Sequence, residues 1–371
     1  MRILNIILCL FLCLPLTGCW DYERINDRAQ VTGIAVDPVP GNSHQVIFTL
    51  HVPIFVQSSD SSDKMSGRSR HYKNFRVSCS TLSAALSKLQ TRNSKEFYLA
   101  NLQVVILNDH LRDEQIEQIV GSVMGNTSSD KLAYLFMTSE HAGDFLSGPS
   151  INEPADDLDN VLSRVRQSGY SVRRRIWEFW RDTTQPGINP TTAKLRSSPD
   201  GFDVGGAVVF QGFQPICELP MEETINYNII MGKMKNISMT FPYKNSDIEV
   251  SHLKSYSKRS VQQIHGHVEL VDNILLKGDL DVSATNGEIE LSPNDMRLYE
   301  KVIEMTVKRH VIQLIRACQK KKVDPFGFGL KEMIVHPNDK PIVSDNWPTL
   351  FSSALVNVHV KVEIGHKGAF N

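Results

Sequence analysis

The sequence has almost no excess of charge of either sign. Its 371 residues include 40 lysines and arginines against 41 aspartates and glutamates, which leaves a formal net charge of −1. The chain therefore has no overall field that would attract nucleic acid or an acidic substrate. Because 41% of the residues are hydrophobic, wholesale disorder is excluded as well.

Cysteine is scarce after the first 19 residues, where only three remain: Cys79, Cys217 and Cys318. Three widely spaced thiols cannot complete a set of disulfides, and no C-x-x-C pair or Cys/His cluster suggests structural zinc. We therefore expect free, buried thiols. We also expect no metal and no cofactor.

Motifs of enzyme active sites are missing or incomplete. S-x-x-K occurs four times, at residues 61–64, 128–131, 251–254 and 255–258, and residues 344–346 add S-D-N, but no K-T-G follows. Four matches in a chain rich in serine and lysine indicate chance. Gly327-Phe328-Gly329 lacks the third glycine of a dinucleotide turn and follows a helical pattern, so we interpret it as a helix stop. We predict no catalytic residues and no enzyme.

Three other polar features also have a structural explanation. His265 and His267 have no acidic or sulfur partner nearby in sequence, so we expect surface or partly buried histidines rather than metal ligands. Six arginines between residues 164 and 181 accompany Trp177 and Trp180. A helix that packs its tryptophan face into the domain is favoured there over a helix lying on anionic lipid. We expect the cations at 308–309 and 320–322 to be solvated, with the last group matching a helix dipole.

The N-terminus predicts a lipoprotein signal peptide. Met1-Arg2 precedes an apolar stretch over residues 3–16, which is too short to span a bilayer as a helix. Leu16-Thr17-Gly18-Cys19 then resembles a bacterial lipobox, with cleavage between Gly18 and Cys19 and a diacylglyceryl group on the Cys19 sulfur. No later run approaches 18 apolar residues. The mature chain is therefore expected to be a water-soluble body held on a membrane by its first residue, although a plain secretory signal is the alternative.

Hydrophobic periodicity predicts an α+β protein with mixed or antiparallel sheets flanked by helices. The expected strands are residues 31–36, 45–55, 75–79, 97–107, 132–137, 202–210 and 353–364. The expected helices begin at Ser80 or Thr81 and at Asp109 or Asp113, and three more cover residues 141–146, 171–181 and 293–322. Gly41-Asn42 predicts a hairpin turn between the first two strands.

Proline, serine and threonine concentrate over residues 183–200, where we place a boundary. The expected organisation is a signal peptide at 1–18, an N-terminal domain at 19–185, a linker at 186–201 and a C-terminal domain at 202–367. The length allows two mixed α/β domains, or three.

From the lipobox onward the sequence resembles the Ger(x)C lipoproteins, the C subunits of the nutrient germinant receptors of endospore-forming bacteria. The matching stretches occur in the family's order: Gly18-Cys19-Trp20-Asp21, Ile25-Asn26-Asp27, VTGIAVD at 31–37, FYLANLQVVIL at 97–107, GAVVF at 206–210, DPFGFG at 324–329 and Trp347. The resemblance covers nearly the whole mature chain.

The resemblance implies a non-enzymatic subunit, lipid-anchored through Cys19 on the outer face of the spore inner membrane. Its partners would be the multi-spanning A subunit and the transporter-like B subunit of the receptor, with nutrient binding assigned more plausibly to those membrane subunits. Residues 324–329 are a candidate interface. Two other functions stay open: a lipid-anchored solute-binding protein of a transporter, and an envelope hydrolase.

Overall fold

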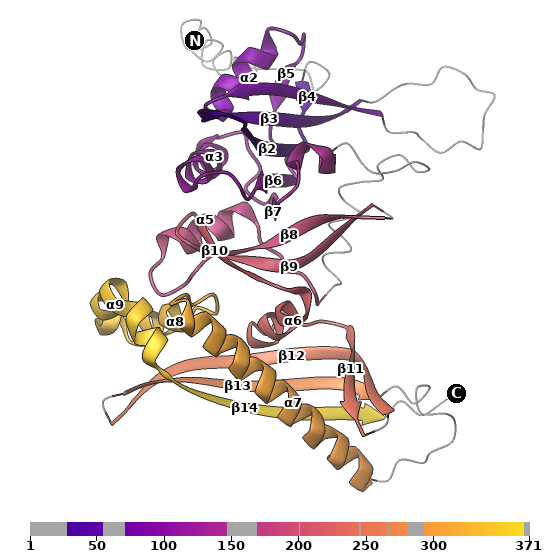
Figure 1. Ribbon diagram of the computed structural model, residues 1–371, viewed down its shortest axis with the longest axis vertical. Coiled ribbons are helices and arrows are strands. Elements are labelled where there is room, and N and C mark those ends of the chain that lie inside the picture. The colour runs from indigo at the N-terminus through magenta and orange to yellow at the C-terminus, as the bar shows by residue number, and fades with distance from the viewer. Residues whose placement is uncertain are drawn as a thin grey trace, which may run out of the picture.

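A computed structural model of the chain describes residues 28–54, 71–146, 169–199, 201–244, 246–265, 267–280 and 293–366. Gly18, Cys19 and the S-x-x-K match at 61–64 lie outside these residues. The molecule is elongated, with an eight-stranded and a two-stranded sheet in its upper half and a four-stranded sheet in its lower half (Figure 1). No helix among the described residues is both long enough and apolar enough to cross a membrane.

The upper half is built on an eight-stranded mixed sheet in the order β10-β9-β8-β7-β6-β2-β3-β4. Its strands are β2 (Gly33–Val39), β3 (Asn42–Ile54), β4 (His71–Cys79), β6 (Val104–Asn108), β7 (Tyr134–Thr138), β8 (Thr191–Ser198), β9 (Gly201–Gln211) and β10 (Gln214–Leu219). The four central strands β2, β6, β7 and β8 are parallel, and the strands outside them are antiparallel to their neighbours. This confirms the prediction of mixed sheets.

Alternating side chains bury both faces of this sheet. Residues such as Val105 and Leu107 face a core that contains α2 (Leu82–Gln90), α3 (Asp113–Gly125) and α5 (Ile176–Thr184). Their neighbours Val104 and Ile106 face the other side, where η3 (Ala142–Leu146) packs. Figure 1 shows the three helices on one side of the sheet. The core on both faces follows from the period of two along each strand.

Two local predictions are confirmed in detail. The antiparallel hairpin β2–β3 turns at Gly41, whose φ of 75° is a conformation that glycine adopts without strain. Thr81 caps α2 by accepting a hydrogen bond from Ala84 N at 3.2 Å.

Two element boundaries were predicted wrongly. Residues 97–107 form two strands instead of one: β5 (Glu96–Tyr98) pairs with β1 (Arg28–Gln30), whereas β6 joins the large sheet. A turn closed by Leu102 N and Leu99 O separates them. Residues 171–175 are extended instead of helical, because their backbone pairs with neighbouring strands, as in the bond from Leu135 N to Arg174 O.

The lower half contains a four-stranded sheet in the order β11-β12-β13-β14. Its strands are β11 (Ile237–Tyr243), β12 (Ser246–Ile264), β13 (His267–Leu280) and β14 (Leu355–His366). The helices of this half are α6 (Met221–Ile230), α7 (Pro293–Lys320), α8 (Phe328–Val335), η5 (Pro337–Asp339) and α9 (Lys340–Ser353). β14 returns parallel to β13 after the helices, so this sheet is mixed as well. One continuous core unites the sheet with α6 to α9.

The division of the chain at 186–201 stays a prediction, but the large sheet runs through that range. Residues 191–198 are β8, which pairs with β7 on one side and β9 on the other. β9 and β10 continue the same sheet, although they follow the expected linker. The prolines on both sides of β8 gave this stretch the composition of a linker.

Candidate functional site

The residues that sequence patterns singled out for chemistry serve structural contacts. Lys131 Nζ donates a hydrogen bond to Val123 O, at the end of α3, at 2.8 Å. Ser255 is buried on β12 and accepts a bond from Met234 N at 3.1 Å. Lys131 and Ser255, from two of the S-x-x-K matches, thus have ordinary roles in the fold.

The histidine and tryptophan features also fit their structural interpretations. His265 and His267 are exposed on either side of the β12–β13 turn. Trp180 on α5 packs against Phe213, with ring centroids 5.8 Å apart, and its neighbour Phe179 is fully buried. Trp180 therefore packs into the domain as expected, whereas Trp177 is half-buried with the Arg181 guanidinium over its ring.

One group of side chains that the sequence did not single out has the composition of a metal site. Ligand atoms of Glu332, His336 and Asp339 lie within 4.8 Å of one another where α8 meets η5. Glu332 Oε1 is already 3.2 Å from His336 Nδ1, and burial raises the pKa of Glu332. A hydrogen bond between Glu332 and His336 therefore accounts for the approach of these two side chains without a metal ion.

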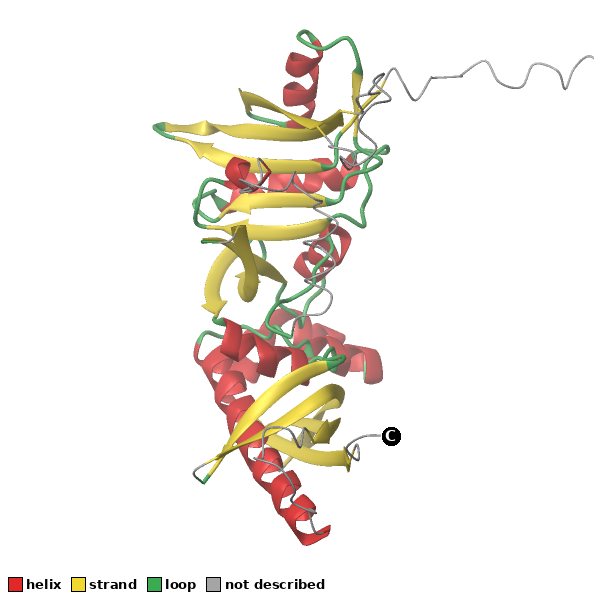
Figure 2. Ribbon diagram, turned by 90° about the vertical axis from the view of Figure 1, so that its right-hand side faces the viewer, coloured by secondary structure: helices red, strands yellow, loops and turns green. Residues whose placement is uncertain are grey.

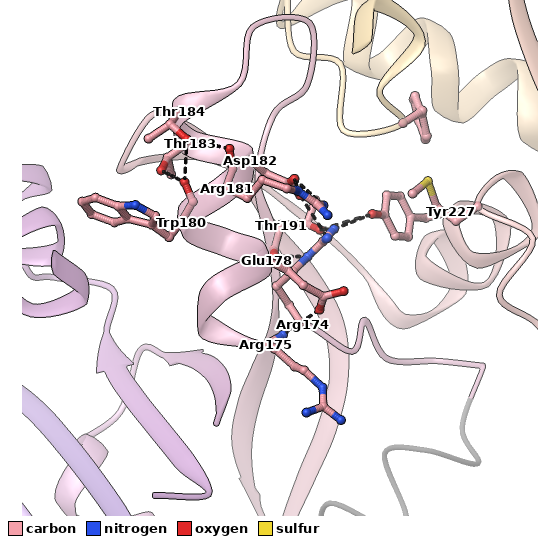
Figure 3. Close-up of polar contacts among 12 residues, drawn as sticks. Arg174, Arg175, Glu178, Trp180, Arg181, Asp182, Thr183, Thr184, Thr191 and Tyr227 are labelled. Atoms are coloured by element: carbon pink, nitrogen blue, oxygen red, sulfur yellow. Dashed lines mark hydrogen bonds and ion pairs between the residues drawn. The ribbon is translucent and has the colours of Figure 1, made fainter. Parts of the chain in front are cut away.

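One densely connected polar cluster lies between the two halves and is called here the Arg174 network. Arg174, just before α5, points toward Asp182, Thr191 and Tyr227 (Figure 3). Its Nη1 lies 3.0 Å from Asp182 Oδ2, and Nη2 donates to Thr191 Oγ1 at 2.7 Å and to Tyr227 OH at 3.2 Å. One guanidinium therefore joins α5 and β8 of the upper half to α6 of the lower half.

Every member of the Arg174 network is buried. The side chains of Arg174 and Asp182 are 2% and 0% exposed, and Tyr227 is fully buried. Although burial opposes the charge, Tyr227 and Asp182 hold the pKa of Arg174 above its usual value. Asp182 has a second cation, Arg181, whose Nη2 is 2.6 Å from Oδ1. The buried Asp182 carboxylate thus lies between two guanidinium groups, of which that of Arg181 is outside the buried network and 42% exposed.

The second contact between the halves is the turn at residues 324–329, called here the Asp324 turn. Asp324 accepts hydrogen bonds from the backbone N–H groups of Phe326, Gly327 and Gly329 and from Trp347 Nε1, over 2.9 to 3.1 Å. Burial nevertheless raises the pKa of Asp324 to about 6. The carboxylate thus holds together the end of α7, the start of α8 and the middle of α9.

The Asp324 turn contacts the segment that leads into β8. Asn189 N donates to Asp324 O at 2.8 Å, and Asp324 N donates to Asn189 Oδ1 at 2.7 Å. Gly187 lies so close that a Cβ there would be 2.5 Å from the carbonyl carbon of Gly329. The candidate interface at 324–329 is therefore a contact within the chain. Asp324 and Phe328 are buried in this contact.

This junction joins two sheets through buried polar contacts and through apolar side chains, because Ala207 and Val209 of β9 belong to the same core as the lower sheet. Arg174 and Asp182 were not singled out by sequence, because one arginine in a run of three, at 173–175, has no signature of its own. The DPFGFG pattern did identify the Asp324 turn. The arrangement can fix the orientation of one half relative to the other, which is a mechanical role.

A cavity of about 320 Å³ lies elsewhere, on the upper half. It is lined mainly by polar side chains from the start of α3 and neighbouring strands, among them His44, Ser80, Arg112 and Gln115. A solute-binding protein would instead need a cleft between two similar lobes. The halves here are built on eight-stranded and four-stranded sheets, so they are not repeats of one lobe.

Known spore germination proteins are similar to this chain over almost its whole length. A family model described as the spore germination protein N-terminal domain matches residues 21–197, and one described as spore germination B3/GerAC-like, C-terminal, matches residues 205–368. Spore germination protein B3 of Bacillus subtilis (strain 168) is 24% identical over 92% of this chain and 92% of its own. Spore germination protein GerQC of Bacillus cereus is 18% identical over 65% of this chain and 68% of its own. The crystal structure of the GerBC protein has the same fold, with a TM-score of 0.58 and 18% identity over 93% of this chain and 99% of that one.

Proposed function

Because the chain belongs to the GerAC-like family of spore germination proteins, we propose that it is the lipid-anchored C subunit of a nutrient germinant receptor. The observation that carries this proposal is the order and coverage of the two family models, which leave out only residues 1–20, 198–204 and 369–371. The subunit acts as a non-enzymatic scaffold that assembles or couples the A and B membrane subunits. It lies on the outer face of the spore inner membrane.

The anchor in this proposal is the acylated Cys19. Two acyl chains give stable attachment, whereas one chain is marginal. Tethering raises the effective concentration of the subunit near its membrane partners, so interfaces of modest size suffice. Mass spectrometry of the mature N-terminal peptide tests the anchor. The expected peptide begins at a diacylglycerylated Cys19, and a peptide that begins elsewhere or carries an unmodified cysteine would contradict it.

The partners are tested by affinity purification from detergent-solubilised spore inner membranes. The expected result is recovery of the A and B subunits of one receptor with this chain, and their absence when an unrelated spore lipoprotein is the bait. Recovery of a transporter permease and its ATPase instead would favour a solute-binding protein. Recovery of this chain alone from membranes that contain the receptor would refute a stable complex.

A further inference from the structure

Helix α7 has one side in the core and one side that no described element covers. It has 28 residues and is therefore about 42 Å long. Ile303, Val307, Val311 and Leu314 are buried against the four-stranded sheet. Figures 1 and 2 both show the helix lying along that sheet with its opposite side open. We call this open side the α7 outward face.

The exposed charges on the α7 outward face all have one sign. Its exposed ionised residues are Arg297, Lys301, Lys308, Arg309, Arg316 and Lys320. The acidic residues of α7 are half-buried: Glu300 and Glu304 lie elsewhere on the helix, whereas Asp295 takes the same position in the seven-residue period as Arg309 and Arg316. Glu304 Oε1 and Glu300 Oε1 accept hydrogen bonds from Val362 N and Ile364 N of the edge strand β14, each at 3.0 Å. Among the described residues, no carboxylate lies within ion-pair distance of these six cations.

A row of apolar side chains runs between these cations. Leu298 is 44% exposed and Met305 is 65% exposed, whereas Ile312 is partly buried and packs against the core of the lower half. Their spacing of seven residues places them within about 40° of one another around the helix, over about 21 Å of its length. Arg297, Lys301 and Lys308 lie on one side of the row at this periodicity, and Arg309, Arg316 and Lys320 lie on the other. Single exposed apolar residues are common on protein surfaces and need no explanation. A row of them at regular spacing, bordered on both sides by cations, is instead typical of a contact surface.

The width of the apolar row decides which occupant fits. A helix that inserts into a lipid surface needs an apolar face about 100° wide or wider, whereas a helix–helix seam is narrow and repeats at about seven residues. The row here is narrow. Cations beside such a seam select a partner helix with acidic residues beside its own apolar row.

We propose that the α7 outward face is the docking surface for an acidic amphipathic helix of a partner protein. The helix lies along Leu298, Met305 and Ile312, and its carboxylates meet the cations on both sides of the row. The expectation that Lys308 and Arg309 are merely solvated is the competing account. The two accounts differ in what lies against Met305 in the membrane-bound protein.

Photo-crosslinking in intact spore membranes tests this proposal. A photoreactive phenylalanine analogue replaces Met305 in the full lipoprotein, and Tyr256, 53% exposed on β12, carries the same group in a control. We expect an adduct from position 305 whose sequenced partner segment is acidic with apolar residues at seven-residue spacing. The control at position 256 should not give that adduct.

Charge variants show whether the contact is the proposed one. Lys301→Glu, Lys308→Glu and Arg309→Glu together should lower the adduct yield about tenfold or more, because like charges would then face each other. The matched variant with Lys301→Arg, Lys308→Arg and Arg309→Lys keeps the charge and should keep the yield. Since all three side chains are exposed, both variants should melt like wild type. Three results would each overturn the proposal: adducts with lipid, no adduct above that of the control, or an adduct yield that the charge reversal does not change.

Discussion

The substitution Asp182→Asn removes the carboxylate that faces the buried guanidinium of Arg174. The two groups are 3.0 Å apart and almost completely shielded from water. Arginine cannot lose its proton, so the variant keeps a buried positive charge whose remaining hydrogen-bond partners, Thr191 and Tyr227, are neutral, while Glu178 still favours that charge without a hydrogen bond to it. Breaking a buried ion pair in this way costs about 3–5 kcal/mol of unfolding free energy.

Urea unfolding of the purified protein, followed by tryptophan fluorescence, measures this cost. The control Asp203→Asn removes an exposed carboxylate on β9 and should change stability by less than about 0.5 kcal/mol. Adding Arg174→Met to Asp182→Asn should recover part of the loss, because the uncompensated charge is then gone. A cost for Asp182→Asn within about 1 kcal/mol of the control would refute the description of this pair as buried and essential.

Three further predictions concern other buried groups. Burial raises the pKa of Asp272 to about 6, so the protonated carboxyl favours the folded state at low pH and this stabilisation is lost as the pH rises to about 6. In urea titrations, the unfolding free energy of Asp272→Asn relative to that of wild type should therefore rise by up to about 3 kcal/mol between pH 4 and pH 7. A difference that does not change with pH would contradict this prediction. Gly187→Ala should cost at least about 2 kcal/mol in thermal unfolding, because φ is +76° and the new Cβ would meet the α8 backbone. All three thiols are free, and Cys79 and Cys318 are buried. Burial also raises the pKa of Cys217 and Cys318, which lowers the fraction of reactive thiolate. In thiol labelling of the native protein, Cys217 should therefore react slowly, and Cys79 and Cys318 should react only after unfolding.

Local patterns predicted much of the fold. The β2–β3 hairpin follows from Gly41-Asn42, and the α2 cap follows from Thr81, because both depend on a few adjacent residues. The long helix was expected at 293–322 and is α7 at Pro293–Lys320, since its apolar period is sustained over many turns. Turn residues, helix caps and apolar periodicity each lie within one element, so they do not depend on which other element packs against it.

Long-range pairing could not be predicted in the same way. Residues 191–198 form a strand inside the sheet because β7 and β9 supply hydrogen bonds from both sides. The local Thr- and Pro-rich sequence does not indicate which strands will pair with it. Arg174 looks like any surface arginine until Asp182 and Tyr227 surround it. The Asp324 turn was noticed by its residues, but its burial depends on Asn189 and Trp347, which are distant in sequence.

Germination of spores that carry Cys19→Ala tests the proposed function most directly. The response to a panel of nutrients is measured as loss of refractility, beside wild type and a strain without the gene, with the level of the protein checked. We expect the variant to lose the same nutrient response that the deletion strain loses, although the protein is still made. A variant that keeps that response would contradict a receptor subunit that acts through its lipid anchor, and a deletion that affects no response would contradict the receptor role itself.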